Sequence, residues 1–357
     1  MEPLRVAIVA PPWFELPPTA YGGIESVCAY LVDELVARGV DVTLIGVGRN
    51  RTATKFVNTF SAPQGERLGT GLPEVLHAAM LPGILAELDV DVVHDHSLAG
   101  PLLARGREVP TVVTAHGPVT GEMGLYYRSL SDSAHLVALS RAQRANAPEL
   151  NWVGTVHNAV RVADFPVRHD KEDFALFLGR TTPEKGLPDA IAAANRAGVR
   201  LLIGAKCREP EEKRYFEREV EPRLNDNVEW LGEVDRVRKL ELLAAARCLL
   251  FPIHWEEPFG MVMVEALACG TPVVALRRGS VPEVVVDGET GFVCDDLEDL
   301  VAALHSTGEL SADRCRAEAE ERFDVELMAA RYEHIYRTVV GGQPEADNRL
   351  AALRTAV

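Results

Sequence analysis

The chain has 357 residues, of which 47% are apolar and 25% are charged, and its formal net charge is −16. Such a length exceeds the size at which one hydrophobic core stops growing, and the composition excludes intrinsic disorder, so we expect two folded domains. The negative charge argues against nucleic acid or a generally anionic membrane as a partner, because both would be repelled.

The first half of the chain opens with a strand, helix, strand pattern. Arg5–Ala10 is an apolar run that predicts a strand, and a Pro-rich loop separates it from an amphipathic helix at Ile24–Arg38. Gly39 suits the left-handed end of that helix, and a second strand follows at Asp41–Gly46. Further strands are expected at Val90–His94, Thr111–Ala115 and Leu136–Ser140.

The second half repeats this opening. A strand at Asp173–Leu178 and a loop at Gly179–Lys185 precede a helix at Gly186–Ala197 and a strand at Val199–Gly204. Further strands are expected at Cys248–Pro252 and Pro272–Leu276. Apolar strands alternating with helices imply parallel sheets covered on both faces, so the fold class is α/β, with two doubly wound Rossmann-like domains. Because such folds bind ligands at the carboxyl ends of their strands, the domains should face a central cleft.

We expect three segments along the chain. Residues 1–163 should form the N-terminal domain and residues 164–323 the C-terminal domain. Residues 324–357 should begin with a helix that packs back on the N-terminal domain, because Val325–Val340 has helical periodicity, and should end in a polar tail. The domain boundary is expected in the polar stretch Asn158–Lys171.

The cysteines and the start of the chain bear on its compartment. The six cysteines contain no C-x-x-C pair, so we interpret them as reduced packing residues. The chain enters its first strand without a basic leader, a cleavage site or an apolar run long enough to span a bilayer. These features predict a cytoplasmic protein. The sequence shows no basic amphipathic helix of the kind that binds a membrane surface.

Two glutamates flank a strand-to-helix junction in the second half. The segment E-P-F-G-M-V-M-V-E runs from Glu257 to Glu265 and begins a predicted helix. The backbone N–H groups of Phe259, Gly260 and Met261 should then lie at a helix N-terminus, which favours a phosphate or a sugar hydroxyl. One carboxylate is suited to sugar hydroxyls and the other to a ribose. The alternative is a pair of solvated glutamates on a helix edge.

Two basic residues follow the first strand of the second unit, and two glycines follow the first strand of the first unit. Arg180 and Lys185, in G-R-T-T-P-E-K-G, can converge on one diphosphate, Arg through its planar fork and Lys as a point charge. The alternative is a salt-bridged Arg and a surface Lys. Gly22 and Gly23 begin the first helix and would let its N-terminus approach a diphosphate from the other domain, although Gly-Gly is also an ordinary loop feature.

Three histidines and two aspartates in the first half are candidate ligands of a sugar or a metal ion. His116 follows a strand and is expected at its carboxyl end, where a neutral imidazole can bond a sugar hydroxyl. His94 and His96 have the spacing of a metal pair, but no third ligand has a recognisable spacing, which favours an acceptor-side wall instead. Asp89 and Asp91 precede a strand, so they belong to the edge of the sheet opposite the ligand and are rejected as a metal-nucleotide motif.

An ordered set of motifs over nearly the whole chain resembles the family-4 retaining glycosyltransferases of GT-B fold. The run from Glu257 to Ala275 resembles their donor-site signature. Further matches are A-Y-G-G-I-E, D-V-V-H-D-H-S, V-V-T-A-H-G, L-V-A-L-S, F-L-G-R-T-T-P-E-K-G, L-G-E-V and S-V-P-E-V-V-V-D-G-E-T-G-F-V. The Y-G-G-I and V-V-H-D-H-S segments are similar to a sugar transferase of an oligosaccharide-antibiotic pathway.

The resemblance implies roles for the matching residues. Arg180 and Lys185 would neutralise the diphosphate as the glycosidic bond breaks, together with the helix that begins near Phe259. Glu257 and His116 would orient the donor sugar, so that these four charged or polar side chains are the catalytic set. The family is discussed as using a front-face displacement in which the departing diphosphate takes the acceptor proton.

A second group of residues is expected on the nucleotide side. Gly232, Glu233 and Val234, in L-G-E-V, resemble the loop whose backbone reads the nucleobase edge, although a plain turn has the same sequence. Gly204 and Lys206 end the neighbouring strand and would line the same pocket. Two further residues, Ser140 and Asn158, match small polar positions of the family.

The sequence thus predicts a metal-independent, retaining hexosyltransferase without a cofactor. Its donor would be a UDP-sugar or a GDP-sugar, with UDP favoured, and its acceptor an unidentified hydroxyl on a small molecule, a glycan or a lipid-linked molecule. Three rivals remain. A dinucleotide oxidoreductase would need the G-x-G-x-x-G fingerprint, which neither first strand has. A sugar-nucleotide epimerase of related two-domain fold, or a catalytically silent sugar-nucleotide-binding protein, would be distinguished by turnover.

Overall fold

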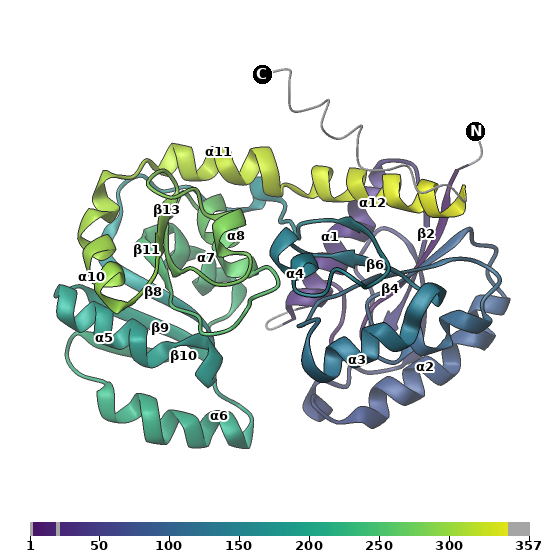
Figure 1. Cartoon of the computed structure of the whole chain (residues 1–357), viewed down its shortest axis with the longest axis horizontal. Coiled ribbons are helices and arrows are strands. Elements are labelled where there is room, and N and C mark those ends of the chain that lie inside the picture. Colours follow the sequence, from purple (N-terminus) through teal and green to yellow (C-terminus); the bar gives the residue numbers. More distant parts are fainter. Residues whose placement is uncertain (1–2, 19–21, 342–357) are drawn as a thin grey trace.

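The computed structural model describes residues 3–18 and 22–341 of the chain, and Figure 1 shows two α/β domains within them. The N-terminal domain is built on a seven-stranded sheet of order β3-β2-β1-β4-β5-β6-β7, in which all pairings are parallel. Its strands are β1 (Arg5–Val9), β2 (Asp41–Val47), β3 (Lys55–Phe60), β4 (Val92–Asp95), β5 (Thr111–Thr114), β6 (His135–Ala138) and β7 (Trp152–Thr155).

The C-terminal domain has a six-stranded parallel sheet of order β10-β9-β8-β11-β12-β13. Its strands are β8 (Glu172–Arg180), β9 (Arg200–Lys206), β10 (Val228–Gly232), β11 (Ala246–Phe251), β12 (Val273–Leu276) and β13 (Gly291–Cys294). In each sheet the strand order reverses beside the first strand, at β1/β4 and at β8/β11, which is the switch point where doubly wound folds bind ligands. The expected fold class is confirmed.

Helices cover both sheets. Those of the N-terminal domain are α1 (Gly23–Ala37), α2 (Gly71–Ala86), α3 (Gly121–Leu130), α4 (Arg141–Ala145) and the 3₁₀ helix η2 (Gly100–Gly106). Those that follow are α5 (Leu187–Ala197), α6 (Pro210–Tyr215), α7 (Arg236–Ala245), α8 (Met261–Ala268), α9 (Val281–Val284), α10 (Leu297–Ser306), α11 (Ala312–Phe323) and α12 (Val325–Val340). Among the described residues, no helix has the length and apolarity needed to cross a bilayer.

The last helix joins the two halves. Figure 1 shows α11 on the C-terminal domain and α12 continuing over the N-terminal domain beside α1. Met328, Tyr332 and Tyr336 of α12 are buried in the same apolar core as Leu31 and Leu35 of α1. The polar tail predicted after residue 341 lies outside the described residues, and the domain limits remain a prediction.

The structure departs from the sequence-based expectation at two places near the site. β8 continues through Arg180 and pairs with Lys206 of β9, so the loop predicted from Gly179 starts two residues later. None of the expected strands falls in the stretch 48–71, which contains β3, a parallel edge strand beside β2. Its six residues are mostly half-buried or exposed, so they lack the continuous apolar run by which the central strands were found.

Candidate active site

A cavity of about 140 Å³ lies between the two domains. It is lined by Gly23, Ile24, His116, Leu139 and Asn158 of the N-terminal half and by residues 257–261 of the C-terminal half. Gly23 is the first residue of α1 and Met261 the first residue of α8, so two helix N-termini meet there, and their partial positive charges favour an anion. Six of the predicted site residues, Gly23, His116, Glu257, Phe259, Gly260 and Met261, line this cavity.

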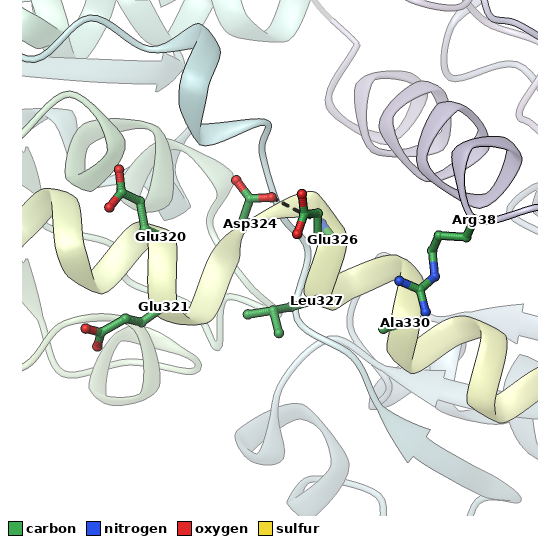
Figure 2. Close-up of a pocket in the computed structure, with 7 residues that line it drawn as sticks. All are labelled: Arg38, Glu320, Glu321, Asp324, Glu326, Leu327 and Ala330. Carbon is green, nitrogen blue, oxygen red and sulfur yellow. Dashed lines mark hydrogen bonds between the residues drawn. The ribbon is translucent and has the colours of Figure 1, made fainter. Parts of the chain in front are cut away.

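A larger cavity, of about 510 Å³, lies where α11 meets α12 (Figure 2). Its lining contains four carboxylates, from Glu320, Glu321, Asp324 and Glu326, and one guanidinium, from Arg38. This excess of negative charge would repel a diphosphate. Size alone therefore does not identify the site, and the smaller cavity between the helix N-termini is the better candidate.

Lys185 is held on Glu257. Its Nζ donates to Oε2 of Glu257 over 2.6 Å, and the indole Nε1 of Trp255 donates to the same oxygen over 3.0 Å. The ammonium also lies 5.0 Å from the centre of the Trp255 ring, within reach of a cation–π attraction. The predicted basic residue and the predicted sugar-binding carboxylate are thus in direct contact, at the edge of the cavity that Glu257 lines.

A glycine explains how Lys185 reaches this position. Gly186 has φ +69°, and a Cβ placed on it would lie 1.8 Å from the carbonyl oxygen of Pro252, the first residue of the loop that leads from β11 toward α8. The backbone N–H of His254 also donates to the carbonyl of Glu184 over 2.8 Å. The loop that carries Lys185 is therefore packed directly on the loop that carries Glu257, which only glycine permits.

The start of α8 has no side-chain cap. Gly260 is its N-cap with φ +77°, and no side chain accepts from the first N–H groups of the helix. The side chain of Phe259 is buried in the domain core beside His157 and Phe323, so only its backbone is available at the cavity. Backbone donors without a side-chain cap suit a phosphate or hydroxyl ligand.

Arg180 lies on a neighbouring strand end and is paired differently. Its Nε donates to Oε1 of Glu212 over 2.9 Å, and Glu212 also lies 3.9 Å from Nζ of Lys206. Lys206 is buried and donates to Glu209 over 2.5 Å. The two predicted diphosphate ligands, Arg180 and Lys185, thus have different carboxylate partners, and Arg180 is not part of the cavity lining.

The predicted nucleotide-side residues gather at the ends of β9 and β10. Gly204 pairs with Gly232, and a Cβ on Gly204 would lie 3.2 Å from Val234, so glycine there allows the loop to pack closely. Glu233 pairs with Arg208 over 2.6 Å. Glu265, on α8, accepts from Lys239 over 2.7 Å. These groups are not part of the lining of the cavity between the domains, and their roles remain predictions.

His116 is oriented by a second histidine. Its Nε2 lies 2.8 Å from Nδ1 of His96, and burial lowers the pKa of His116 to about 4 and that of His96 well below its usual value, so both rings are neutral. Nε2 of His96 is buried without a partner. A buried N–H without an acceptor is rarer than a buried acceptor without a donor, so we assign the proton between the rings to His96. His116 then carries its own proton on Nδ1.

His94 is a structural residue. Its Nδ1 lies 2.7 Å from the hydroxyl of Tyr336 and its Nε2 lies 2.8 Å from that of Thr114, which also bonds Tyr332 over 2.8 Å. Both nitrogens are thus engaged, and the part of the chain that the structure describes holds no group of three or more metal-ligating side chains. Asp89 and Asp91 pair with Arg5 at the beginning of β1, the edge of the sheet opposite the cavity.

Three further polar residues lie at or near the boundary between the domains. Asn158 is 6% exposed and lines the cavity, and its Oδ1 is buried without a partner. Glu283 of α9 accepts from the backbone N–H groups of Arg141 and Ala142, across the domain boundary. By contrast, Ser140 caps α4 through the N–H of Gln143, which is a structural role. Long-range pairings such as that of Glu283 leave no local pattern.

Comparisons with known proteins agree with this architecture. A family model described as Glycosyltransferase Family 4 matches residues 21–163, and one described as Glycosyl transferases group 1 matches residues 163–322. The phosphatidyl-myo-inositol mannosyltransferase of Mycolicibacterium smegmatis is 30% identical over 291 residues, which cover 72% of this chain and 73% of that protein. The chain belongs to glycosyltransferase family 4.

Solved structures and a further relative extend the match. AviGT4, a glycosyltransferase involved in avilamycin A biosynthesis, superposes with a TM-score of 0.74 at 29% identity and covers 95% of this glycosyltransferase and 99% of that chain. The glycogen synthase of Mycobacterium tuberculosis is 26% identical over 417 residues, 99% of both chains. HepE of Anabaena, solved with UDP-glucose, has a TM-score of 0.71 at 17% identity over 95% of this chain and 100% of that one, and supports the GT-B fold alone.

Proposed function

We propose that this glycosyltransferase transfers a hexose from a nucleoside-diphosphate sugar to a hydroxyl acceptor, with retention at the anomeric carbon and without a metal ion. The observation that carries the proposal is the Lys185–Glu257 pair beside a cavity into which the uncapped start of α8 opens. Cation, carboxylate and helix N-terminus together match a ligand that joins an anionic diphosphate to a sugar.

In the proposed reaction the bond from the anomeric carbon to the diphosphate oxygen breaks while a bond to the acceptor oxygen forms on the same face. The departing diphosphate takes the acceptor proton. The ammonium group of Lys185 would donate hydrogen bonds to both Glu257 and the diphosphate. Arg180 would add a second cation from the neighbouring strand end. Glu257, His116 and Asn158 would bond sugar hydroxyls, and positioning would supply much of the rate.

A UDP-sugar is the favoured donor and a GDP-sugar the second choice. A fold neighbour has been solved with UDP-glucose, which supports uridine at the level of fold only. The acceptor remains a hydroxyl on a small molecule, a glycan or a lipid-linked molecule. Relatives whose names refer to a lipid, to glycogen and to an antibiotic match the chain comparably well, so they favour none of the three classes.

A thermal-shift panel of UDP-, GDP- and ADP-glucose in the presence of EDTA tests the proposal. A ligand at 100 times its Kd stabilises the folded state by about 2.7 kcal/mol, so we expect a clear rise in Tm with the UDP-sugar and release of UDP when an acceptor is added. If no nucleotide sugar raises Tm, or only without EDTA, the proposal is wrong. Binding without UDP release would instead favour the epimerase or the silent binding protein.

A pair of lysine variants makes the panel specific. Lys185→Ala should remove most of the ligand-induced rise in Tm, because the diphosphate loses a charge-assisted hydrogen bond. Lys55→Ala is the matched control: Lys55 also pairs with a carboxylate, Asp41, but its side chain is 70% exposed on β3. The control should respond to the ligand as the wild type does.

A further inference from the structure

Helix α2 presents an apolar outer face to solvent. The inner face is buried in the N-terminal domain, and the outer face exposes Leu72, Val75, Leu76 and Met80, whose exposed fractions are 40% to 57%. These four residues follow the spacing of one helix face. Glu74 is the single charged residue of α2, and it is buried. The outer face of a surface helix normally carries polar and charged residues, so an apolar outer face indicates a surface that a partner covers.

The exposed apolar face extends beyond α2. η2 lies against both α2 and α3, and Figure 1 shows these two helices along the lower edge of the N-terminal domain. Leu98, Leu102, Leu103 and Leu125 add exposed leucine side chains from the loop after β4, from η2 and from α3. These eight side chains, which we call the α2 surface, are most of the ten large apolar side chains that are exposed in the described part of the chain.

Hydrogen bonds hold the parts of the α2 surface together. Oε2 of the buried Glu74 accepts from the backbone N–H groups of Leu98 and Ala99, over 3.0 and 3.2 Å. From the other side, the hydroxyl of Tyr126 on α3 donates to the carbonyl of Leu98 over 2.5 Å. A surface that is ordered before binding loses little conformational entropy when a partner covers it.

We propose that the α2 surface is a homodimer interface, in which a second copy of this chain covers it across a two-fold axis. The net charge of −16 makes two copies repel each other over most orientations, and the α2 surface is an uncharged region where they can meet. The cores of homodimer interfaces are apolar and depleted in charge, as this one is.

The charges around the surface favour a second copy over a bilayer. Arg67, Arg105 and Arg128 are exposed on or next to the elements of the surface. Four glutamates are exposed there too: Glu66, Glu87, Glu108 and Glu122. In a two-fold interface each basic residue can face an acidic residue of the other copy. An anionic bilayer would instead need a surplus of Lys and Arg, which these elements lack.

The surface also has the extent that a stable dimer needs. α2 exposes nine residues, η2 four and α3 five. Specific interfaces take about 20 to 30 residues from each partner, a number that these elements and their flanking loops together approach. Gly83 lies in the exposed half of α2, and a Cβ there would meet nothing in the fold, so it leaves room for close approach of a partner helix.

Sedimentation velocity and light scattering of the full chain test the proposal over a range of micromolar concentrations. We expect a dimer in the wild type. Leu76→Glu and, separately, Leu125→Glu should weaken the dimer Kd at least tenfold while the circular dichroism spectrum and Tm stay close to wild type, because both side chains are already exposed. Val237→Glu is the matched control: Val237 is 68% exposed on α7, outside the surface, and this variant should stay dimeric.

Two results would overturn the proposal. One is a wild type that is monomeric at all concentrations; flotation with vesicles of phosphatidylcholine, with and without 30% phosphatidylglycerol, would then ask whether the surface binds lipid instead. The other is a dimer that both glutamate variants leave intact, which would place the interface elsewhere. Neither result depends on turnover, so the dimer proposal is tested independently of the proposed function.

Discussion

His116 and His96 form a pair in which one ring sets the proton position of the other. The 2.8 Å bond occupies Nε2 of His116, so Nδ1 is the nitrogen left for a ligand in the cavity. Because Nε2 of His96 is buried without a partner, we expect His116 in its Nδ1–H form, which presents a donor to a sugar oxygen.

We predict that His96→Ala removes the hydrogen bond that fixes His116 in its Nδ1–H form. Two-dimensional proton–nitrogen correlation spectra should show Nδ1–H for His116 in the wild type and a mixture of both tautomers in the variant. We expect kcat to fall roughly tenfold, which corresponds to about 1.4 kcal/mol, the contribution of one hydrogen bond. His305→Ala, at an exposed position on α10, is the control. An unchanged His116 spectrum in His96→Ala would show that His96 does not position the ring.

Glu25 is the second residue for which the environment decides the charge. It lies in the first turn of α1 and is 3% exposed, and burial raises its pKa to about 7, although backbone N–H groups of Glu25 and Phe14 oppose the shift. A raised carboxyl pKa means that the folded chain binds the proton more tightly than the unfolded chain. Stability therefore falls as the pH rises from about 4.5 to about 7 and stays low above it.

We predict that Glu25→Gln removes this loss. The variant should be more stable than the wild type at pH 8, by on the order of 2 kcal/mol, and should match it near pH 4, below the unfolded pKa. Urea unfolding at the two pH values measures the difference. Glu122→Gln, on the exposed start of α3, should be neutral at both. Equal stability of Glu25→Gln and wild type at pH 8 would contradict a buried, ionised Glu25.

At the scale of elements, Gly186 ties two loops of the site together. A Cβ would lie 1.8 Å from the carbonyl oxygen of Pro252, and φ is already +69°. We predict that Gly186→Ala costs the C-terminal domain at least about 2 kcal/mol and displaces Lys185 from Glu257, so that donor binding falls. Thermal unfolding and the ligand-induced shift in Tm report the two effects separately.

Gly198 provides the control for this prediction. It ends α5 with φ +65°, but a Cβ there would meet nothing within 4 Å. Gly198→Ala should therefore show the left-handed strain alone, about 1 kcal/mol, with donor binding intact. If both variants lose stability equally, the close approach of the Pro252 carbonyl does not matter.

The same elements show what the sequence can and cannot predict. The start of helix α8 was predicted near Gly260, where the structure has it, because glycine at a strand-to-helix junction is a local signal; Gly260 and Gly270, which follows the helix, both have positive φ. The edge strand β3 was missed because its residues are half exposed. The placement of Lys185 on Glu257 joins residues 72 positions apart, and no periodicity records such a contact. The order of the motifs predicted which loops carry the site. The contact between the loop of Lys185 and the loop of Glu257 is visible only in the structure.

At the scale of the whole molecule, Glu283 contributes a hydrogen-bonded contact between the two domains. Its carboxylate, on α9, accepts from the N–H groups of Arg141 and Ala142 over 2.9 and 2.7 Å and from Nε2 of His157 over 3.3 Å. Arg141 and Ala142 begin α4. A carboxylate of one domain therefore accepts hydrogen bonds from the first backbone N–H groups of a helix in the other domain. Burial would raise the pKa of Glu283, but these hydrogen bonds outweigh it and lower the pKa to about 2.

A lowered carboxyl pKa stabilises the folded state above the unfolded value of about 4.5, and the contribution is lost as the pH falls toward about 2. We predict that Glu283→Gln destabilises the chain at pH 7 by at most about 3 kcal/mol, with a difference that shrinks between pH 4.5 and pH 2. Because the cavity takes its lining from both domains, the KM for the donor should rise and the radius of gyration from X-ray scattering should increase.

The surface carboxylate Glu149 is the control for this domain contact. It also pairs with an arginine, Arg128, but within one domain and with its side chain 52% exposed, so Glu149→Gln should leave the scattering curve and KM unchanged. If Glu283→Gln gives the wild-type radius of gyration and the wild-type pH dependence, the domains are held by other contacts. The pairing of Arg236 of α7 with Tyr30 of α1 over 3.2 Å would then be the next contact to remove.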